Sequence, residues 1–251
     1  MQEYVDTLPR RERERMARKA VMLEAAQEVF AEKGYTRATL EEVAARAEYG
    51  KGTLYNYFPG GKQEILLAIV EHFHDELCYL IERTFSLPTN RSFRESLESF
   101  LQHTFAFFMD RSELFLTLLR EAHRIGLSDD PEPRAFFTAQ RERALNALSA
   151  PLEHAMKSGE VRPLPPRLLA HMILVNLNGA QLRACMGPTE SESDFPDTSH
   201  EMAAFMSGLI MDGLHRTSST DPTGLSEADR VSAKGISSLP SDADQLSSHV
   251  L

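Results

Sequence analysis

The spacing of apolar residues constrains the fold of this chain more than any other feature of its sequence. Apolar positions recur every three to four residues along most of its length, which is the period of an amphipathic helix. No window shows the sustained alternation of apolar and polar residues that is typical of a half-buried strand. The sequence therefore predicts an all-α protein.

Gly, Pro, Asp and Ser residues interrupt the pattern and divide it into separate helices. Near the N-terminus we expect helices at about 18–33, 39–47, 51–58 and 62–86. Farther along we expect helices at about 91–110, 112–126, 133–157, 166–186 and 198–216. Residues 1–17 either form a charged helical lead-in or stay mobile as an arm. Residues 217–251 are rich in Ser, Asp, Gly and Pro, which predicts a disordered tail.

The segment between residues 18 and 62 has the signals of a small helical domain. Gly34 follows the first helix at the position of a C-terminal stop. Thr39 and Glu42 have the spacing of a capping box, in which the Thr39 hydroxyl accepts a hydrogen bond from the Glu42 amide. The short helix at 51–58 points Leu54 and Phe58 inward. Three short helices with a tight break before the third indicate a helix-turn-helix.

The outward side chains of the short helix suit contact with a duplex. Lys51 can reach a phosphate or a guanine edge, and Asn56 an adenine edge. Thr53 can meet a phosphate or a thymine methyl, and Tyr55 and Tyr57 offer hydroxyls to phosphate oxygens. These residue types predict that the 51–58 helix lies in a major groove.

Charge is distributed unevenly along the chain, whose net charge is -10. Residues 1–62 contain 11 Lys and Arg against 10 Asp and Glu, whereas residues 63–251 contain 16 against 27. Affinity for phosphates follows the local patch rather than the total charge. The acidic composition therefore does not exclude a nucleic-acid partner.

A set of residues in this segment resembles the N-terminal domain of TetR-family regulators. The set comprises Ala25-Ala26, Val29-Phe30, Gly34-Tyr35, Thr39, Val43-Ala44, Ala47, residues 51–58, Lys62 and Leu66. The resemblance implies an all-α homodimer that binds a palindromic operator in double-stranded DNA and releases it when a small-molecule inducer occupies the C-terminal body. The DNA contacts that it implies are Thr39, Lys51, Gly52, Thr53, Tyr55, Asn56, Tyr57 and Lys62, of which Lys62 meets phosphate.

Two departures from the family pattern bear on the recognition helix. The family has Gly in the interhelix turn where this chain has Glu48, and a non-Gly residue at positive φ costs about 1 kcal/mol unless Gly50 takes over the turn. The chain also carries one residue more than the family between Phe58 and Lys62. Either departure can shift the angle of the helix.

The resemblance also implies a ligand pocket among the helices between residues 90 and 186. Phenylalanines there can form apolar walls, and a few polar side chains can anchor a ligand. The ligand-binding candidates are His103, Phe107, Phe115, Arg120, His123, Phe137, Asn176 and Gln181. The identity of the inducer cannot be read from them.

The helices at 166–186 and 198–216 are the predicted dimer interface. Both carry apolar surface broader than a single stripe, and small residues such as Gly179 and Gly208 allow close helix approach. Two such helices from each subunit would form an intermolecular four-helix bundle. A buried monomeric core is the alternative interpretation.

Catalytic signatures are absent from the sequence. It contains no Gly-x-Ser-x-Gly, P-loop or Cys-x-x-Cys motif, and His72 and His74 diverge on a helix. We therefore expect no enzyme, no metal and no cofactor. Short apolar runs and a charged N-terminus predict a cytoplasmic protein without a membrane span. A helical adaptor that binds no DNA is the alternative function.

These expectations divide the chain into four parts. Residues 1–17 form the arm and 18–64 the helix-turn-helix domain. Residues 65–216 form the ligand-binding and dimerisation body, and 217–251 the tail.

Overall fold

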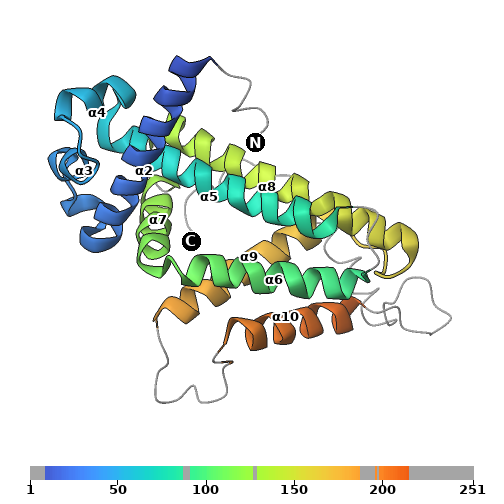
Figure 1. The fold of residues 1–251 in the computed structure, drawn as a ribbon. Coiled ribbons are helices and arrows are strands. Elements are labelled where there is room, and N and C mark those ends of the chain that lie inside the picture. Colours follow the sequence, from blue (N-terminus) through green and yellow to red (C-terminus); the bar gives the residue numbers. More distant parts are fainter. Residues whose placement is uncertain (1–8, 87–90, 127–128, 187–195, 197, 215–251) are drawn as a thin grey trace, which may run out of the picture. The chain divides into compact units, whose positions relative to one another are not determined.

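The computed structural model describes residues 9–86, 91–126, 129–186, 196 and 198–214, and every regular element in these ranges is an α-helix (Figure 1). The predicted all-α class is therefore confirmed for this part of the chain. No helix within it is long and apolar enough to cross a membrane. The predicted tail at 217–251 and residues 1–8 of the arm lie outside the described residues.

The N-terminal helices form a compact group. They are α2 (Arg10–Arg37), α3 (Leu40–Arg46), α4 (Lys51–Tyr57) and the long α5 (Gly61–Phe85). The first helix begins eight residues earlier than the predicted start at 18, so residues 10–17 are helical, which is one of the two alternatives that the sequence left open. Gly34 interrupts helical geometry near the end of α2, with φ 74°. Glycine adopts this conformation without the Cβ clash that other residues meet.

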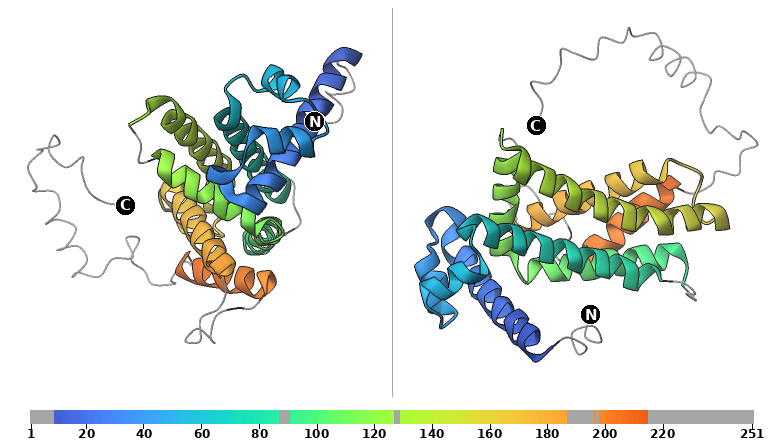
Figure 2. Two further views of the ribbon diagram at one scale, coloured as in Figure 1. Left: turned by 90° about the vertical axis from the view of Figure 1, so that its left-hand side faces the viewer. Right: turned by 90° about the horizontal axis from the view of Figure 1, so that it is seen from above.

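The remaining helices form the body. They are α6 (Phe93–Met109), α7 (Ser112–Gly126), α8 (Pro131–Ser158), α9 (Pro166–Met186) and α10 (Ser199–Leu214). Helix α6 packs against α5, α8 packs against both α5 and α9, α10 packs against α6, and α7 packs against α2 (Figure 2). Asp130 caps the start of α8 next to Pro131, and left-handed Gly159 ends it.

Two apolar cores stabilise this arrangement. The first core joins α2, α3, α4 and the start of α5 to α7, with Phe30, Ile69 and Phe115 among its members. The second core joins the end of α5 to α6, α8, α9 and α10 and includes Phe100 and Leu148. Because the first core crosses the boundary predicted at 64–65, the head is packed directly against the body through α7.

Candidate functional site

Helix α3 is fixed to α2 by a cap and by ion pairs. The predicted capping box is present: the Glu42 amide donates to Thr39 Oγ1 at 3.3 Å, and the Thr39 amide donates to Glu42 Oε2 at 3.1 Å. Glu42 also accepts from Lys33 of α2 at 2.6 Å. This hydrogen bond, together with that from the Thr39 amide, holds the pKa of Glu42 below its ordinary value.

Arg46 makes the second connection between these helices. Its guanidinium binds Glu32 with both terminal nitrogens, each at 2.9 Å, and Glu28 at 2.8 Å. Planar bidentate pairs of this kind restrict orientation more than single contacts do. The position of α3, and of the turn that follows it, is therefore held from α2.

The interhelix turn uses Glu48 rather than a glycine in the left-handed conformation. Glu48 has φ 59°, whereas Gly50 has φ -70° and begins α4. Gly50 does not relieve the turn, so the cost of about 1 kcal/mol for a side chain in this conformation falls on Glu48. The turn nevertheless keeps helix-turn-helix geometry, because Val43 and Ala44 pack in the first core on one side of it and Leu54 on the other.

Helix α4 has the two faces that the sequence predicts. Leu54 and the following Phe58 are each 1% exposed and lie in the first core. Lys51, Tyr55 and Asn56 are exposed on the other side. Of the other predicted contacts on this helix, Gly52 is exposed, and Thr53 and Tyr57 are half-buried. The short helix therefore presents a polar face whose orientation is set by two buried anchors.

The Lys51 ammonium is paired with the Glu41 carboxylate of α3. The hydrogen bond raises the pKa of Lys51 and lowers that of Glu41. Both side chains are more than half exposed, so solvent screens the pair and its net stabilisation is small. Lys51 can therefore exchange this carboxylate for a phosphate or a base edge.

Lys62 takes part in a contact that sequence reasoning missed. Its ammonium donates to the carbonyl oxygens of Tyr35 at 2.8 Å, Ala38 at 3.0 Å and Thr36 at 3.2 Å. An ammonium has three N–H groups, and all three are used here. Lys62 thus ties the start of α5 to the α2–α3 connection, and in this geometry it has no donor for the phosphate contact that we predicted.

The extra residue before Lys62 is accommodated by the two glycines of this connection. Gly61 has φ 65°, and the Gly60 amide donates to Glu64 Oε2 at 2.7 Å. The first of these conformations favours glycine. The insertion is therefore absorbed between Phe58 and Lys62 while both remain anchored.

The structure separates the predicted ligand-binding residues into two groups. Phe107, Phe115 and Phe137 lie in or against the first core, and Gln181 is fully buried. The other four candidates are exposed, and three of them bond to carbonyls of their own helix. These four are His103, Arg120, His123 and Asn176. The predicted polar anchors, other than Gln181, are therefore not brought to the apolar walls.

Gln181 on α9 has an unusual environment. Neither its amide nitrogen nor its amide oxygen has a hydrogen-bond partner among the described residues. Burying an unpaired polar group costs about 1–3 kcal/mol. Such a group is a candidate anchor for a molecule that enters the body.

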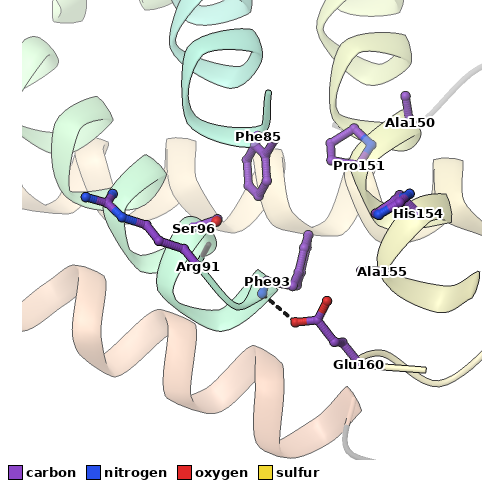
Figure 3. A pocket seen from close by; sticks show the side chains of 9 residues that line it. All are labelled: Phe85, Arg91, Phe93, Ser96, Ala150, Pro151, His154, Ala155 and Glu160. Atoms are coloured by element: carbon purple, nitrogen blue, oxygen red, sulfur yellow. Dashed lines mark hydrogen bonds between the residues drawn. The ribbon is translucent and has the colours of Figure 1, made fainter. Parts of the chain in front are cut away.

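A pocket of about 340 Å³ lies where α5, α6 and α8 end or begin (Figure 3). Its walls come from four separate segments of the chain. They are Phe85, Arg91, Phe93, Ser96, Ala150, Pro151, His154, Ala155 and Glu160. None of these was a candidate from the sequence.

The polar groups of this pocket are mostly engaged in structure. Glu160 Oε2 accepts from the Phe93 amide at 2.6 Å, as Figure 3 shows, and Glu160 Oε1 accepts from the Ser158 hydroxyl at 3.1 Å. The Ser96 hydroxyl, in contrast, is buried without a partner among the described residues. The pocket can hold a small apolar group that offers one hydrogen bond.

An apolar surface lies on α9 and α10. Leu209 is 66% exposed, Phe205 60% and Leu168 58%, and Met172 and Val175 of α9 are exposed as well. These residues belong to the two helices predicted to form the dimer interface. We refer to them together as the α9–α10 face.

Signs of a metal or redox site are lacking in the described ranges. No three His, Cys, Asp or Glu residues gather there in a way that could hold a metal ion. Cys78 and Cys185 are free thiols, and burial raises the pKa of each.

Residues 22–69, from the first core-forming turn of α2 into α5, match the sequence family described as bacterial regulatory proteins, tetR family. The N-terminal part of the chain is a TetR-family domain. An HTH-type transcriptional regulator of Bacillus subtilis, YhgD, is 28% identical over 161 residues, which are 62% of this chain and 78% of that protein. The fatty acid metabolism regulator protein of the same organism is 27% identical over 61% of this chain and 75% of its own length.

Solved structures agree with this assignment. The TetR-family regulator PfmR from Thermus thermophilus is 27% identical and superimposes with a TM-score of 0.58 over 78% of this chain and 99% of its own. The chain is therefore a DNA-binding transcriptional regulator with a TetR-type N-terminal domain.

Proposed function

We propose that this protein is a cytoplasmic, dimeric TetR-family repressor that binds a palindromic operator in double-stranded DNA and leaves it when a small molecule occupies the body. It performs no catalysis. The observation that carries the proposal is the two-faced α4, which exposes Lys51, Tyr55 and Asn56 above buried Leu54 and Phe58. A side-chain set fixed in this way can read a groove without first becoming ordered.

Within α4 we assign base reading to Lys51 and Asn56 and phosphate contact to Thr53, Tyr55 and Tyr57. Thr39 contacts the backbone from the start of α3. Lys62 has a positioning role, because its three hydrogen bonds to carbonyl oxygens hold the α2–α3 connection.

Gly52 supports the same assignment. It lies inside a helix, where glycine costs roughly 0.8–1 kcal/mol relative to alanine. A Cβ at this position would meet no atom within 4 Å, and the fold therefore does not require glycine there. Close approach of a DNA backbone to α4 accounts for it.

The dimer is assigned to the α9–α10 face. Apolar side chains as exposed as Phe205 and Leu209 mark an interaction surface when they lie together. A two-fold interface between these helices also provides two copies of α4, as a palindromic site requires.

For the ligand we propose a largely apolar molecule with one hydrogen-bonding group, held in the body by Gln181. The amide oxygen of Gln181 can accept a hydrogen bond from the ligand and the amide nitrogen can donate one, because the described protein supplies neither. The relationship to a fatty acid metabolism regulator supports an acyl chain as the apolar part.

Selection of bound duplexes from a random library, with the purified protein, tests the DNA half of the proposal. We expect the selection to enrich a palindrome. In a mobility-shift gel at low salt, the wild-type protein should bind this duplex, and the Lys51→Ala variant should bind it more weakly. A protein that retards no duplex at low salt would instead be a helical adaptor, and the proposal would fail.

A further inference from the structure

The first three turns of α2 bury no side chain in the described part of the chain. Residues 10–21 are all exposed, and the buried side of the helix begins at Met22. At 1.5 Å per residue this segment is about 18 Å long. It extends past the neighbouring helices in both Figure 1 and Figure 2.

Cations are concentrated on one side of this segment. Arg11, Arg15, Arg18 and Lys19 fall within an arc of about 100°, because residues three, four and seven apart share a helix face. None of the four has a carboxylate within ion-pairing distance in the described part of the chain. Glu14, next to this arc, is bound instead by Arg10 at 2.7 Å. We call these four residues the α2 stripe.

The α2 stripe is adjacent to the recognition helix. The Arg15 guanidinium carbon lies 5.8 Å from the centre of the Tyr57 ring, and Lys19 Nζ lies 5.4 Å from the centre of the Phe58 ring. Tyr57 is the last residue of α4. The cationic surface therefore continues from the end of α4 along α2.

Nothing within the described protein explains a bare helix of this composition. Like charges four residues apart, such as Arg11 and Arg15, destabilise an isolated helix, and no buried face compensates. A polyanion placed along the stripe removes that repulsion and releases counterions from its own phosphates.

We propose that the α2 stripe is a second DNA-binding surface, which binds backbone phosphates of the duplex outside the bases read by α4. The inference rests on the proposed operator binding and extends it. With one phosphate per 3.4 Å along a strand, a segment of about 18 Å reaches roughly two to five base pairs into the flank. Those contacts carry no sequence information and strengthen binding to any flank.

The test compares two double variants on two duplexes. Arg11→Gln/Arg18→Gln removes two charges from the stripe, and neither residue touches the first core. Arg10→Gln/Arg13→Gln removes two charges from the opposite side of the same turns and is the matched control. Gln has a helix propensity close to that of Arg. The duplexes are the selected operator with ten flanking base pairs on each side, and the same operator trimmed of its flanks.

On the flanked duplex, we expect Arg11→Gln/Arg18→Gln to bind about tenfold more weakly, with a salt dependence shallower by roughly 0.9 per lost phosphate contact. On the trimmed duplex it should equal the wild type, and the control should match the wild type on both. The inference would be overturned if the two variants lost equal affinity, or if the loss were the same on the flanked and trimmed duplexes. Operator binding by the wild type would still stand in either case. Failure of the wild type on both duplexes would instead reject the proposed function.

Discussion

The head and the body of this protein are built from different kinds of contact. In the head, short helices are fixed by a capping box, by Arg46 and by Lys62, and the polar groups that remain outside face solvent. In the body, long helices pack through apolar side chains, and Gln181 and Ser96 are buried without partners in the described part of the chain. The difference indicates that the polar contacts of the head are formed without DNA, whereas the body contains buried polar groups without hydrogen-bond partners in the described residues.

The largest expected effect tests the assembly of the body. Leu209→Arg places a charge at the centre of the α9–α10 face, and we expect it to yield monomers and abolish operator binding, since a buried unpaired charge is strongly unfavourable. Light scattering at micromolar concentration and a mobility shift measure the two effects. Tyr79→Arg is the control, because Tyr79 is 55% exposed but lies on α5. A Leu209→Arg dimer that still binds DNA would place the interface elsewhere.

Lys62→Met tests how the head is fixed. It removes three hydrogen bonds from an ammonium to carbonyl oxygens and leaves those carbonyls unpaired. We expect a loss of about 1.5–3 kcal/mol in unfolding free energy, since bonds from charged donors contribute in that range. Thermal denaturation measures it. Lys33→Met removes a single half-buried pair with Glu42 and should cost less. Equal costs would mean that the carbonyl contacts contribute little to stability.

Asn56→Ala tests base reading by the head. We expect about 1–3 kcal/mol weaker binding to the operator and nearly unchanged binding to a scrambled duplex, because the lost contact is to a base edge. Salt titrations on the two duplexes measure the difference in affinity between operator and scrambled DNA. Thr53→Ala, assigned to phosphate, should weaken both duplexes alike. If neither Asn56→Ala nor Lys51→Ala reduces this difference in affinity, the residues of α4 do not read the base sequence.

Gln181→Leu tests the unpaired polar group of the body. Replacing a buried, unbonded amide by an apolar side chain should raise the unfolding free energy by about 1 kcal/mol and abolish release from the operator by the inducer. Ser96→Ala is the matched control, since it removes the other unpaired group from the pocket in Figure 3 and should leave release intact. A Gln181→Leu protein that is still released by the inducer would contradict the ligand assignment.

The smallest effect concerns the acid stability of the head. The Lys33 and Thr39 bonds lower the pKa of Glu42 from 4.5, so its contribution is present above that pH and is lost as the pH falls through the folded pKa. The difference in melting temperature between wild type and Glu42→Gln should therefore be constant from pH 7 to about pH 5.5 and shrink below pH 4.5. A difference that does not shrink at all below pH 4.5 would point to a cause other than this charge.

Local signals made much of the head predictable. The capping box at Thr39 and Glu42 spans three residues, and the inward Leu54 and Phe58 follow from helical periodicity alone. The early start of α2 was left open between two alternatives, because a helix without a buried face has no apolar period. The role of Lys62 was also missed, since its carbonyl partners lie 24 to 27 residues earlier in the chain.

Body contacts were harder to predict because they depend on segments far apart in the sequence. The pocket in Figure 3 brings together residues from 85 to 160, and none of them has a distinctive spacing. Four polar residues assigned to a ligand instead face solvent, because a single helix offers polar positions on both sides of its apolar face. Gln181 was found by residue type, but its lack of partners could be seen only in three dimensions.

The first core has a consequence for protein engineering. Phe115 and Leu118 of α7 pack with Phe30 of α2, and the Thr117 hydroxyl donates to the Phe30 carbonyl at 3.4 Å. A hybrid regulator that joins residues 9–60 to the body of another family member would expose this apolar surface or set it against unmatched side chains. Specificity transplants are therefore expected to succeed when the donor segment includes α7, or when the exchanged residues are confined to the outer face of α4.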